Sequence, residues 1–192
     1  MSGVDPAPSA ARLVELKVDS EAVFDGKLLH VRRDTVRLAD GTLATREYIV
    51  HPGAVLIVPV LADGRLVVER QYRYPLGRVM VEFPAGKLDP GEAPLDTARR
   101  ELREETGYLA ASWRPLGRVH PVVSYSTEAI EFFVAEDLTQ VGAQLDAGEF
   151  LEIAPMAVPD MLAAIDREEI TDAKTIAALL LYVRHATSAV RP

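Results

Sequence analysis

Three glutamates stand close together in the middle of the chain, at Glu101, Glu104 and Glu105. Apolar residues recur around them at spacings of three and four, which predicts an amphipathic helix. On such a helix the three carboxylates share one face, where like charges repel each other. A divalent cation would offset this repulsion, because Mg²⁺ prefers carboxylate and carbonyl oxygens. A metal held there can polarise a phosphoryl oxygen and lower the pKa of an attacking water.

A Glu-rich helix face is also typical of a solvated surface, and neighbouring arginines are spaced to pair with these glutamates. Other fixed positions favour the metal site. Gly86 and Glu92 stand upstream in a Gly/Pro-bounded loop, and Arg100 directly precedes the first glutamate of the cluster. Gly107 follows the last one, where the C-terminal cap of a helix belongs.

The elements that must position this cluster can be predicted from patterning. Asp40-Gly41 between two β-rich runs predicts a hairpin, and the nearly continuous apolar run at 54–61 predicts a strand buried on both faces. The expected strands are 31–38, 42–50, 54–61, 65–72, 79–83, 113–119, 130–136 and 150–157. The expected helices run from about 95 to 107, from 159 to 167 and from 171 to 185.

Strands that are mostly not joined by βαβ units, with helices beside them, predict a mixed α/β (α+β) fold. A chain of 192 residues suits one compact domain. Within it we expect a disordered tail at residues 1–11, an N-terminal antiparallel strand region at 12–50 and the catalytic part at 51–192.

The amino-acid composition limits the classes of partner that we expect for this protein. The formal net charge is −8, and Lys and Arg are not clustered, which argues against nucleic acid. Cysteine is absent, which fits a reducing cytoplasm. No apolar run approaches the ~20 residues of a membrane span, and the first residues lack the apolar core of a signal peptide. We expect a cytoplasmic protein, and the negative net charge does not exclude a small anionic ligand, because bound metal ions and a few arginines can outweigh it locally.

Residues 86–108 match the motif G-x5-E-x7-R-E-U-x-E-E-x-G-U, where U is a bulky apolar residue, with Tyr108 in the last apolar position. The chain therefore resembles the Nudix hydrolases, which cleave the pyrophosphate of nucleoside diphosphate derivatives. The resemblance implies the Nudix fold, in which a mixed β-sheet is sandwiched between helices. The residues from 51 onward would form its catalytic domain.

The same resemblance implies roles for the residues of the motif. Glu101 and Glu105 would bind Mg²⁺, with Mn²⁺ as the alternative metal. Glu104 would lie close to the same ions as a catalytic or metal-binding residue, and the backbone carbonyl of Ala85 would complete the metal site. Structural roles fall to the other fixed positions, namely an Arg100–Glu92 ion pair and the backbone geometry of Gly86 and Gly107.

Segments outside the motif resemble the ADP-ribose pyrophosphatase branch of the family, over about residues 23–186. They are residues 46–55, 71–75, 81–86 and 170–176. This branch hydrolyses ADP-ribose to AMP and ribose 5-phosphate. Val123 departs from it, because a proline is common at that position. Another nucleotide sugar such as GDP-mannose, or a non-catalytic ADP-ribose sensor, is therefore kept as an alternative.

The branch also implies contacts with the substrate. Arg46 and Arg73 would bind pyrophosphate oxygens, for which guanidinium forks are suited, and Glu82 would contact the ligand as well. Phe24 and Tyr72 are candidates to stack on adenine, although an aromatic residue in a strand is also typical of a core.

The general base is implied to be Glu149, on a loop between the last strands, which would help to deprotonate the attacking water. Glu152, a glutamate of the motif and His120 are its rivals. Members of the branch form homodimers by exchanging N-terminal strands, in which case Arg46 or Phe24 would reach the partner's site. The number of metal ions and the phosphorus attacked are left open.

Overall fold

The computed structural model describes residues 13–143, 145 and 150–188. The described residues form two compact units, of which the first comprises 13–51 with 122–128 and the second comprises 52–121 with 129–143, 145 and 150–188. The N-terminal strands build a sheet of their own, whose strand pairing is satisfied within the first unit.

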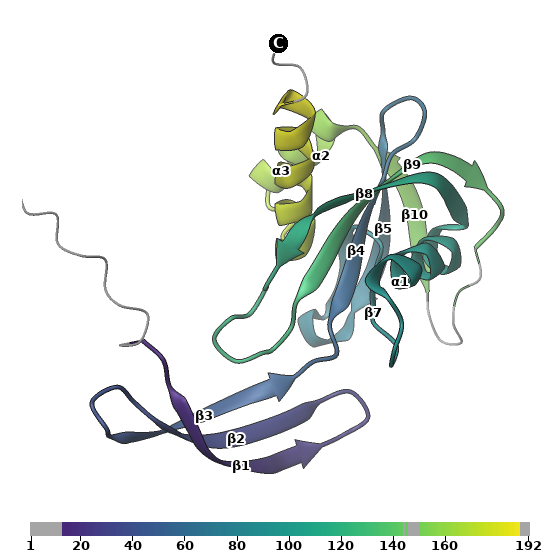
Figure 1. The fold of residues 1–192 in the computed structure, drawn as a ribbon. Coiled ribbons are helices and arrows are strands. Elements are labelled where there is room, and N and C mark those ends of the chain that lie inside the picture. The colour runs from purple at the N-terminus through teal and green to yellow at the C-terminus, as the bar shows by residue number, and fades with distance from the viewer. Residues whose placement is uncertain (1–12, 144, 146–149, 189–192) are drawn as a thin grey trace, which may run out of the picture. The chain divides into compact units, whose positions relative to one another are not determined.

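The first unit is an antiparallel sheet of β1 (Leu16–Asp25), β2 (His30–Arg37) and β3 (Leu43–Val50), in that order (Figure 1). The turn between β2 and β3 is the predicted Asp40-Gly41 hairpin. Asp40 Oδ1 accepts a hydrogen bond of 2.9 Å from the N–H of Thr42, and Gly41 has a φ of 86°, which favours glycine. Residues 122–128 join this unit along β3, where Ile49 bridges Ser126 in parallel.

The described part of the second unit contains two sheets. One is mixed, with the order β7-β4-β9-β8, in which β4 runs parallel to β9. The other is antiparallel, with the order β10-β5-β6. The strands are β4 (Ala54–Pro59), β5 (Leu66–Arg73), β6 (Arg78–Glu82), β7 (Ala85–Lys87), β8 (Tyr108–Val119), β9 (Ile130–Gln140) and β10 (Leu151–Met156).

The helices of the second unit cover opposite faces of the mixed sheet (Figure 1). All of β4 is buried, as its apolar run predicts, and its side chains alternate between two cores. Val55 and Ile57 pack with α1 (Pro94–Glu101). Leu56 and Val58 pack in the larger core that α2 (Val158–Asp166) and α3 (Ala173–Ser188) complete. The predicted sandwich of a mixed sheet between helices is confirmed.

The helix that carries the glutamates is not regular. α1 ends at Glu101, and Leu102–Thr106 forms a π-helical turn. The expectation of one α-helix over the whole cluster is therefore wrong, although Gly107 ends it in the left-handed conformation as predicted (φ 71°). The wider turn allows Leu102, Glu105 and Thr106 all to be buried, and π-turns occur frequently at functional sites.

Other boundaries also differ from the expectation, and β9 extends to Gln140, beyond its predicted end at residue 136. The loop after Phe83 contains the short strand β7, which pairs with β4. β8 begins at Tyr108, five residues before the predicted start, because it pairs with β9 along its whole length. Residues 108–112 include two alanines, a residue type depleted in strands, so their composition gives little strand signal before Trp113. No helix in the described ranges is long and apolar enough to cross a membrane.

Candidate active site

Two pairs of residues meet where strand β7 contacts the end of α1 and the π-turn that follows it. The N–H of Ala85 donates a hydrogen bond of 3.1 Å to Glu105 Oε2. Gly86 lies against Glu101, since a Cβ added at Gly86 would lie 1.8 Å from Glu101 Oε1. Any side chain at this position would displace the carboxylate. Three residues that the family resemblance assigns to metal binding, Ala85, Glu101 and Glu105, therefore meet at the contact between loop and helix.

Arg100 joins the remaining carboxylates. Its Nη1 lies 2.8 Å from Glu101 Oε1 and 3.1 Å from Glu104 Oε2, and its Nη2 lies 3.0 Å from Glu92 Oε2. The Arg100–Glu92 ion pair expected from the resemblance is thus formed. Arg100 also balances the charge of two motif glutamates, so part of the expected repulsion is relieved within the protein itself.

Two residues hold the carboxylate of Glu92 in place. It accepts hydrogen bonds from Arg100 and, at 2.8 Å, from Thr97 Oγ1. The hydrogen bond from Arg100 is the main cause that lowers the pKa of Glu92 to about 2, against an opposing effect of burial. The same pair raises the pKa of Arg100 above its usual value. Loop and helix are therefore joined by a permanently charged pair.

The donor chemistry around Ala85 fits a divalent metal. Carboxylate oxygens of Glu101 and Glu105 lie beside a backbone segment that Gly86 keeps open, and Arg100 links Glu104 to Glu101. Mg²⁺ prefers oxygen ligands of this kind. Within residues 13–143, 145 and 150–188, however, no three His, Cys, Asp or Glu side chains converge closely enough to hold a metal ion. Metal binding would have to draw Glu101 and Glu104 away from Arg100.

Arg73 and Glu82 form a second polar centre. Arg73 Nε and Nη2 donate hydrogen bonds of 2.7 and 2.8 Å to the two oxygens of Glu82, in a bidentate pair. Both residues line a pocket of ≈ 520 Å³ together with Arg78, Met80 and Lys174. Glu82 is three residues from Ala85, so their Cα atoms lie within about 11 Å of each other. The predicted arginine thus reaches the neighbourhood of the metal-binding loop.

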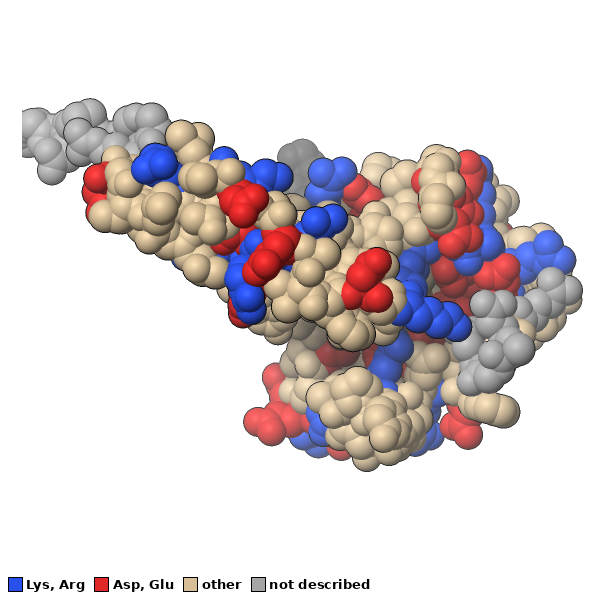
Figure 2. All heavy atoms as spheres, turned by 90° about the horizontal axis from the view of Figure 1, so that it is seen from below, with Lys and Arg blue, Asp and Glu red and all other residues tan. Residues whose placement is uncertain are grey.

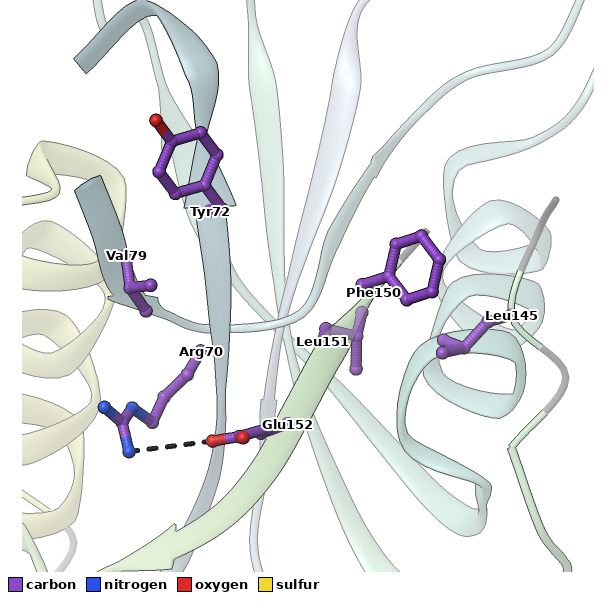
Figure 3. Close-up of a pocket in the computed structure, with 7 residues that line it drawn as sticks. All are labelled: Arg70, Tyr72, Val79, Leu145, Phe150, Leu151 and Glu152. Carbon is purple, nitrogen blue, oxygen red and sulfur yellow. Dashed lines mark ion pairs between the residues drawn. The ribbon is translucent and has the colours of Figure 1, made fainter. Parts of the chain in front are cut away.

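Tyr72 belongs to a different pocket from Arg73. Its side chain is 56% exposed, so it is not a core residue. It lines a cavity of ≈ 470 Å³ with Phe150, Val79 and an Arg70–Glu152 ion pair of 3.6 Å (Figure 3). Adjacent residues of a strand point to opposite faces, which explains why Tyr72 and Arg73 are separated.

The structure describes Glu152 and His120, the alternative candidates for the general base, but not Glu149, the first candidate. Glu149 lies outside the described residues. Glu152 lies in β10, as expected, and its exposed side chain pairs with Arg70. His120 directly follows β8.

The remaining predicted contacts lie in the first unit. Arg46, in β3, donates a hydrogen bond of 2.9 Å from Nε to Glu15 Oε2, and this bond raises the pKa of the guanidinium. Phe24, in β1, is exposed, and its ring lies over Gly26. Val123, where the sequence departs from its branch, is exposed in the 122–128 segment of this unit.

Sequence reasoning assigned no role to three residues at the start of α3. Lys174 forms an ion pair with Glu82, and Thr175 Oγ1 accepts a hydrogen bond of 3.0 Å from the N–H of Phe83. Asp172 Oδ2 accepts one of 3.0 Å from the N–H of Thr175. The resemblance to the branch already included residues 170–176, but the residues that Lys174 and Thr175 bind lie about ninety positions away in the sequence.

On the face drawn in Figure 2, basic and acidic side chains lie interspersed, without the continuous basic stripe that nucleic acids require. Carboxylates beside a backbone loop are groups that can hold a divalent metal, and a metal held there could polarise a phosphoryl oxygen.

The chain belongs to the Nudix family. The family model described as NUDIX domain matches residues 50–179, and the model described as nucleoside diphosphate sugar hydrolase N-terminal domain matches residues 15–49.

Relatives with known names cover most of the chain. An ADP-ribose pyrophosphatase of Bacillus subtilis (strain 168) is 37% identical over 87% of this chain and 91% of that protein. A methanol dehydrogenase activator of Bacillus methanolicus is 35% identical over 86% of this chain and 90% of that protein. A crystal structure of an ADP compounds hydrolase matches with a TM-score of 0.83 and 25% identity, over 93% of this chain and 97% of that one.

Proposed function

We propose that this protein hydrolyses the pyrophosphate of ADP-ribose and releases AMP and ribose 5-phosphate. The observation that carries the proposal is the meeting of Ala85 and Gly86 with Glu105 and Glu101. It is supported by the relative named ADP-ribose pyrophosphatase and by the structural match named ADP compounds hydrolase.

Mg²⁺ is the proposed cofactor, with Mn²⁺ as the alternative. Glu101, Glu104, Glu105 and the carbonyl of Ala85 would hold it. A metal there would supply positive charge to the pyrophosphate and lower the pKa of the attacking water. Gly86 keeps the loop clear of the Glu101 carboxylate, and the Arg100–Glu92 pair fixes the loop against the helix.

The protein's own groups would bind the substrate and move the proton. Arg73, oriented by Glu82, would donate hydrogen bonds to a pyrophosphate oxygen. Arg46 and Phe24 are proposed as further contacts. Glu149 is the proposed base that accepts the proton of the attacking water, with Glu152 and His120 as the residues to test beside it.

The proposal is tested by Glu105→Gln. The amide oxygen of glutamine can still accept the hydrogen bond from Ala85, so the fold should persist while a metal-binding charge is lost. AMP release from ADP-ribose in Mg²⁺ should fall by about a hundredfold or more. Asp96→Asn, which changes an exposed ion pair on the same helix, is the matched control and should keep normal turnover. A Glu105→Gln enzyme with near-normal turnover would overturn the assignment.

A second candidate is favoured by the relatives' names, which differ among themselves. The same scaffold could act on another nucleoside diphosphate derivative such as GDP-mannose, or bind ADP-ribose as a sensor without cleaving it. Initial rates with ADP-ribose, GDP-mannose, NADH and diadenosine polyphosphates distinguish the substrates. Binding of ADP-ribose in Mg²⁺ without release of AMP identifies the sensor.

We also propose that the protein is a cytoplasmic homodimer. The absence of cysteine fits a reducing compartment. The first unit exposes several large apolar side chains, which a monomer would leave in water. They are Leu16, Val18, Val23, Phe24, Leu28, Leu29, Leu43 and Val50.

A further inference from the structure

Glu82 is a buried carboxylate with two cationic partners. Its side chain is only 3% exposed. Arg73 binds both of its oxygens, and Lys174 Nζ donates to Oε2. A buried carboxylate is costly unless it is paired and hydrogen-bonded, so both cations contribute to keeping Glu82 charged.

Further carboxylates lie near the Glu82–Arg73 pair, so without Lys174 one guanidinium would face several negative charges. Glu69, buried in β5, is the direct cross-strand neighbour of Glu82 in β6. Arg73 lies in the electrostatic field of Glu82, Glu69 and Asp172. Burial raises the pKa of Glu82, but the hydrogen bond from Arg73 and the charge and hydrogen bond of Lys174 outweigh it, so the net pKa lies below the usual value.

Lys174 is held in place by its own helix. It occupies the first turn of α3, where Asp172 Oδ2 accepts hydrogen bonds of 3.0 Å from Lys174 Nζ and from the N–H of Thr175. Thr175 Oγ1 in turn binds the N–H of Phe83, the residue after Glu82. The start of α3 is thus fixed to two successive residues just ahead of the metal-binding loop.

One edge of the Arg73 guanidinium is not used in the pair with Glu82. Its hydrogen bonds to Glu82 use Nε and Nη2, and Nη1 makes no hydrogen bond within the described residues. The side chain is 39% exposed and lines the ≈ 520 Å³ pocket. One edge of the guanidinium is therefore held by Glu82, and the side chain as a whole lines the pocket.

We propose that Lys174 is a positioning residue for substrate binding, which shares the charge of Glu82 and so keeps Arg73 turned toward a phosphate oxygen in the pocket. The assignment of Arg73 to the pyrophosphate rests on the proposed function. Without Lys174, the neighbouring carboxylates would compete for one guanidinium and draw it away from the pocket.

The kinetic test compares Lys174→Met, which keeps an apolar stem of similar length, with Lys174→Arg, which keeps the charge. Lys174→Met should raise KM for ADP-ribose about tenfold, the loss expected when one charge-assisted hydrogen bond is weakened, with a much smaller change in kcat. Lys174→Arg should restore KM to near the normal value. Arg167→Gln, which breaks an exposed ion pair with Glu169, is the control. An unchanged KM in Lys174→Met would overturn the proposal.

A double-mutant cycle separates positioning from general stabilisation. If Lys174 acts through Glu82, Lys174→Met should change KM little in a Glu82→Gln background, because the shared charge is already gone. A purely structural role would lower the melting temperature and the active fraction, but would leave KM unchanged. Equal effects of Lys174→Met in both backgrounds would contradict the mechanism.

A measurement without substrate distinguishes this proposal from the proposed function. The Nε–H resonance of Arg73, assigned in the NMR spectrum with Arg73→Lys, should shift or broaden in Lys174→Met and be retained in Lys174→Arg. If the wild type binds and cleaves no ADP-ribose but this resonance responds, the positioning role stands and the substrate assignment fails. If the resonance is unchanged in Lys174→Met, the positioning role fails even in an active enzyme.

Discussion

At the scale of single residues, the site depends on where a few charges are held. Arg100 contacts Glu92, Glu101 and Glu104 at once, so it ties the loop to the helix and balances the charge of two candidate metal ligands. A metal bound there would have to compete with this guanidinium for two carboxylates. Glu105, held instead by the backbone of Ala85, is already oriented toward the loop.

The Arg100–Glu92 pair makes a prediction about pH. The pKa of Glu92 in the folded protein, about 2, lies below its ordinary value of 4.5. The stabilisation from this carboxylate is therefore complete above pH 4.5 and is lost as the pH falls toward 2. Glu92→Gln should lower the melting temperature at pH 7, and the difference from the wild type should shrink below pH 4.5. A difference that stays constant as the pH falls would contradict this account.

Gly86 makes a prediction about metal affinity. Gly86→Ala would place a Cβ 1.8 Å from Glu101 Oε1, so the carboxylate must move. We expect the Mg²⁺ concentration for half-maximal activity to rise about tenfold or more, since one ligand is displaced. Gly91→Ala is the control, because nothing lies within 4 Å of its added Cβ, although its φ of 81° makes alanine strained there. Gly91→Ala should lower stability and leave the Mg²⁺ dependence unchanged.

At the scale of elements, two helix ends shape the site. The π-turn after α1 buries Glu105 beside β7 while Leu102 stays in the core. The first turn of α3 fixes the end of β6 through Thr175 and Phe83. Both helix ends therefore act on the short segment between Glu82 and Gly86.

Asp172 caps α3 and also accepts a hydrogen bond from Lys174, so its substitution tests how much this helix start contributes to stability. Asp172 accepts the N–H of Thr175, three residues on, as an N-cap residue does. Asp172→Ala should cost about 1 kcal/mol of unfolding free energy, which corresponds to a fall of about 3 °C in melting temperature for a chain of this size. Asp172→Asn keeps a capping oxygen and should cost less. Equal melting temperatures for the wild type and Asp172→Ala would show that the cap is not needed.

At the scale of the whole molecule, the chain divides into a strand unit and a catalytic unit. The strand unit leaves large apolar side chains exposed, and this supports the proposed homodimer.

Sedimentation at micromolar concentration tests the dimer. The wild type should sediment as a dimer, and Val18→Lys with Leu43→Lys should shift it to monomer, because both side chains are exposed in the strand unit. Leu180→Lys, at an exposed position of α3, is the control and should remain a dimer. If Arg46 or Phe24 completes the partner's site, the monomeric variant should also lose activity toward ADP-ribose. A clean wild-type monomer would exclude strand exchange.

The sequence by itself determined the features that depend on near neighbours. The Asp40-Gly41 hairpin, the buried run of β4 and the cap at Gly107 follow from local backbone preferences and apolar periodicity. The motif at 86–108 also specified the family, since its residue types and spacing are set by the chemistry.

Only the tertiary structure decided the features that depend on distant partners. The π-turn forms where Glu105 meets the backbone of Ala85, and β8 extends because β9 pairs with it. The role proposed for Lys174 depends on its ion pair with Glu82, a residue 92 positions away in the sequence. Helical spacing and strand patterns report on neighbours within one element, whereas packing selects which elements meet. For this reason the family and the candidate metal-binding residues could be predicted from sequence, whereas the hydrogen-bond network around Arg73 could not.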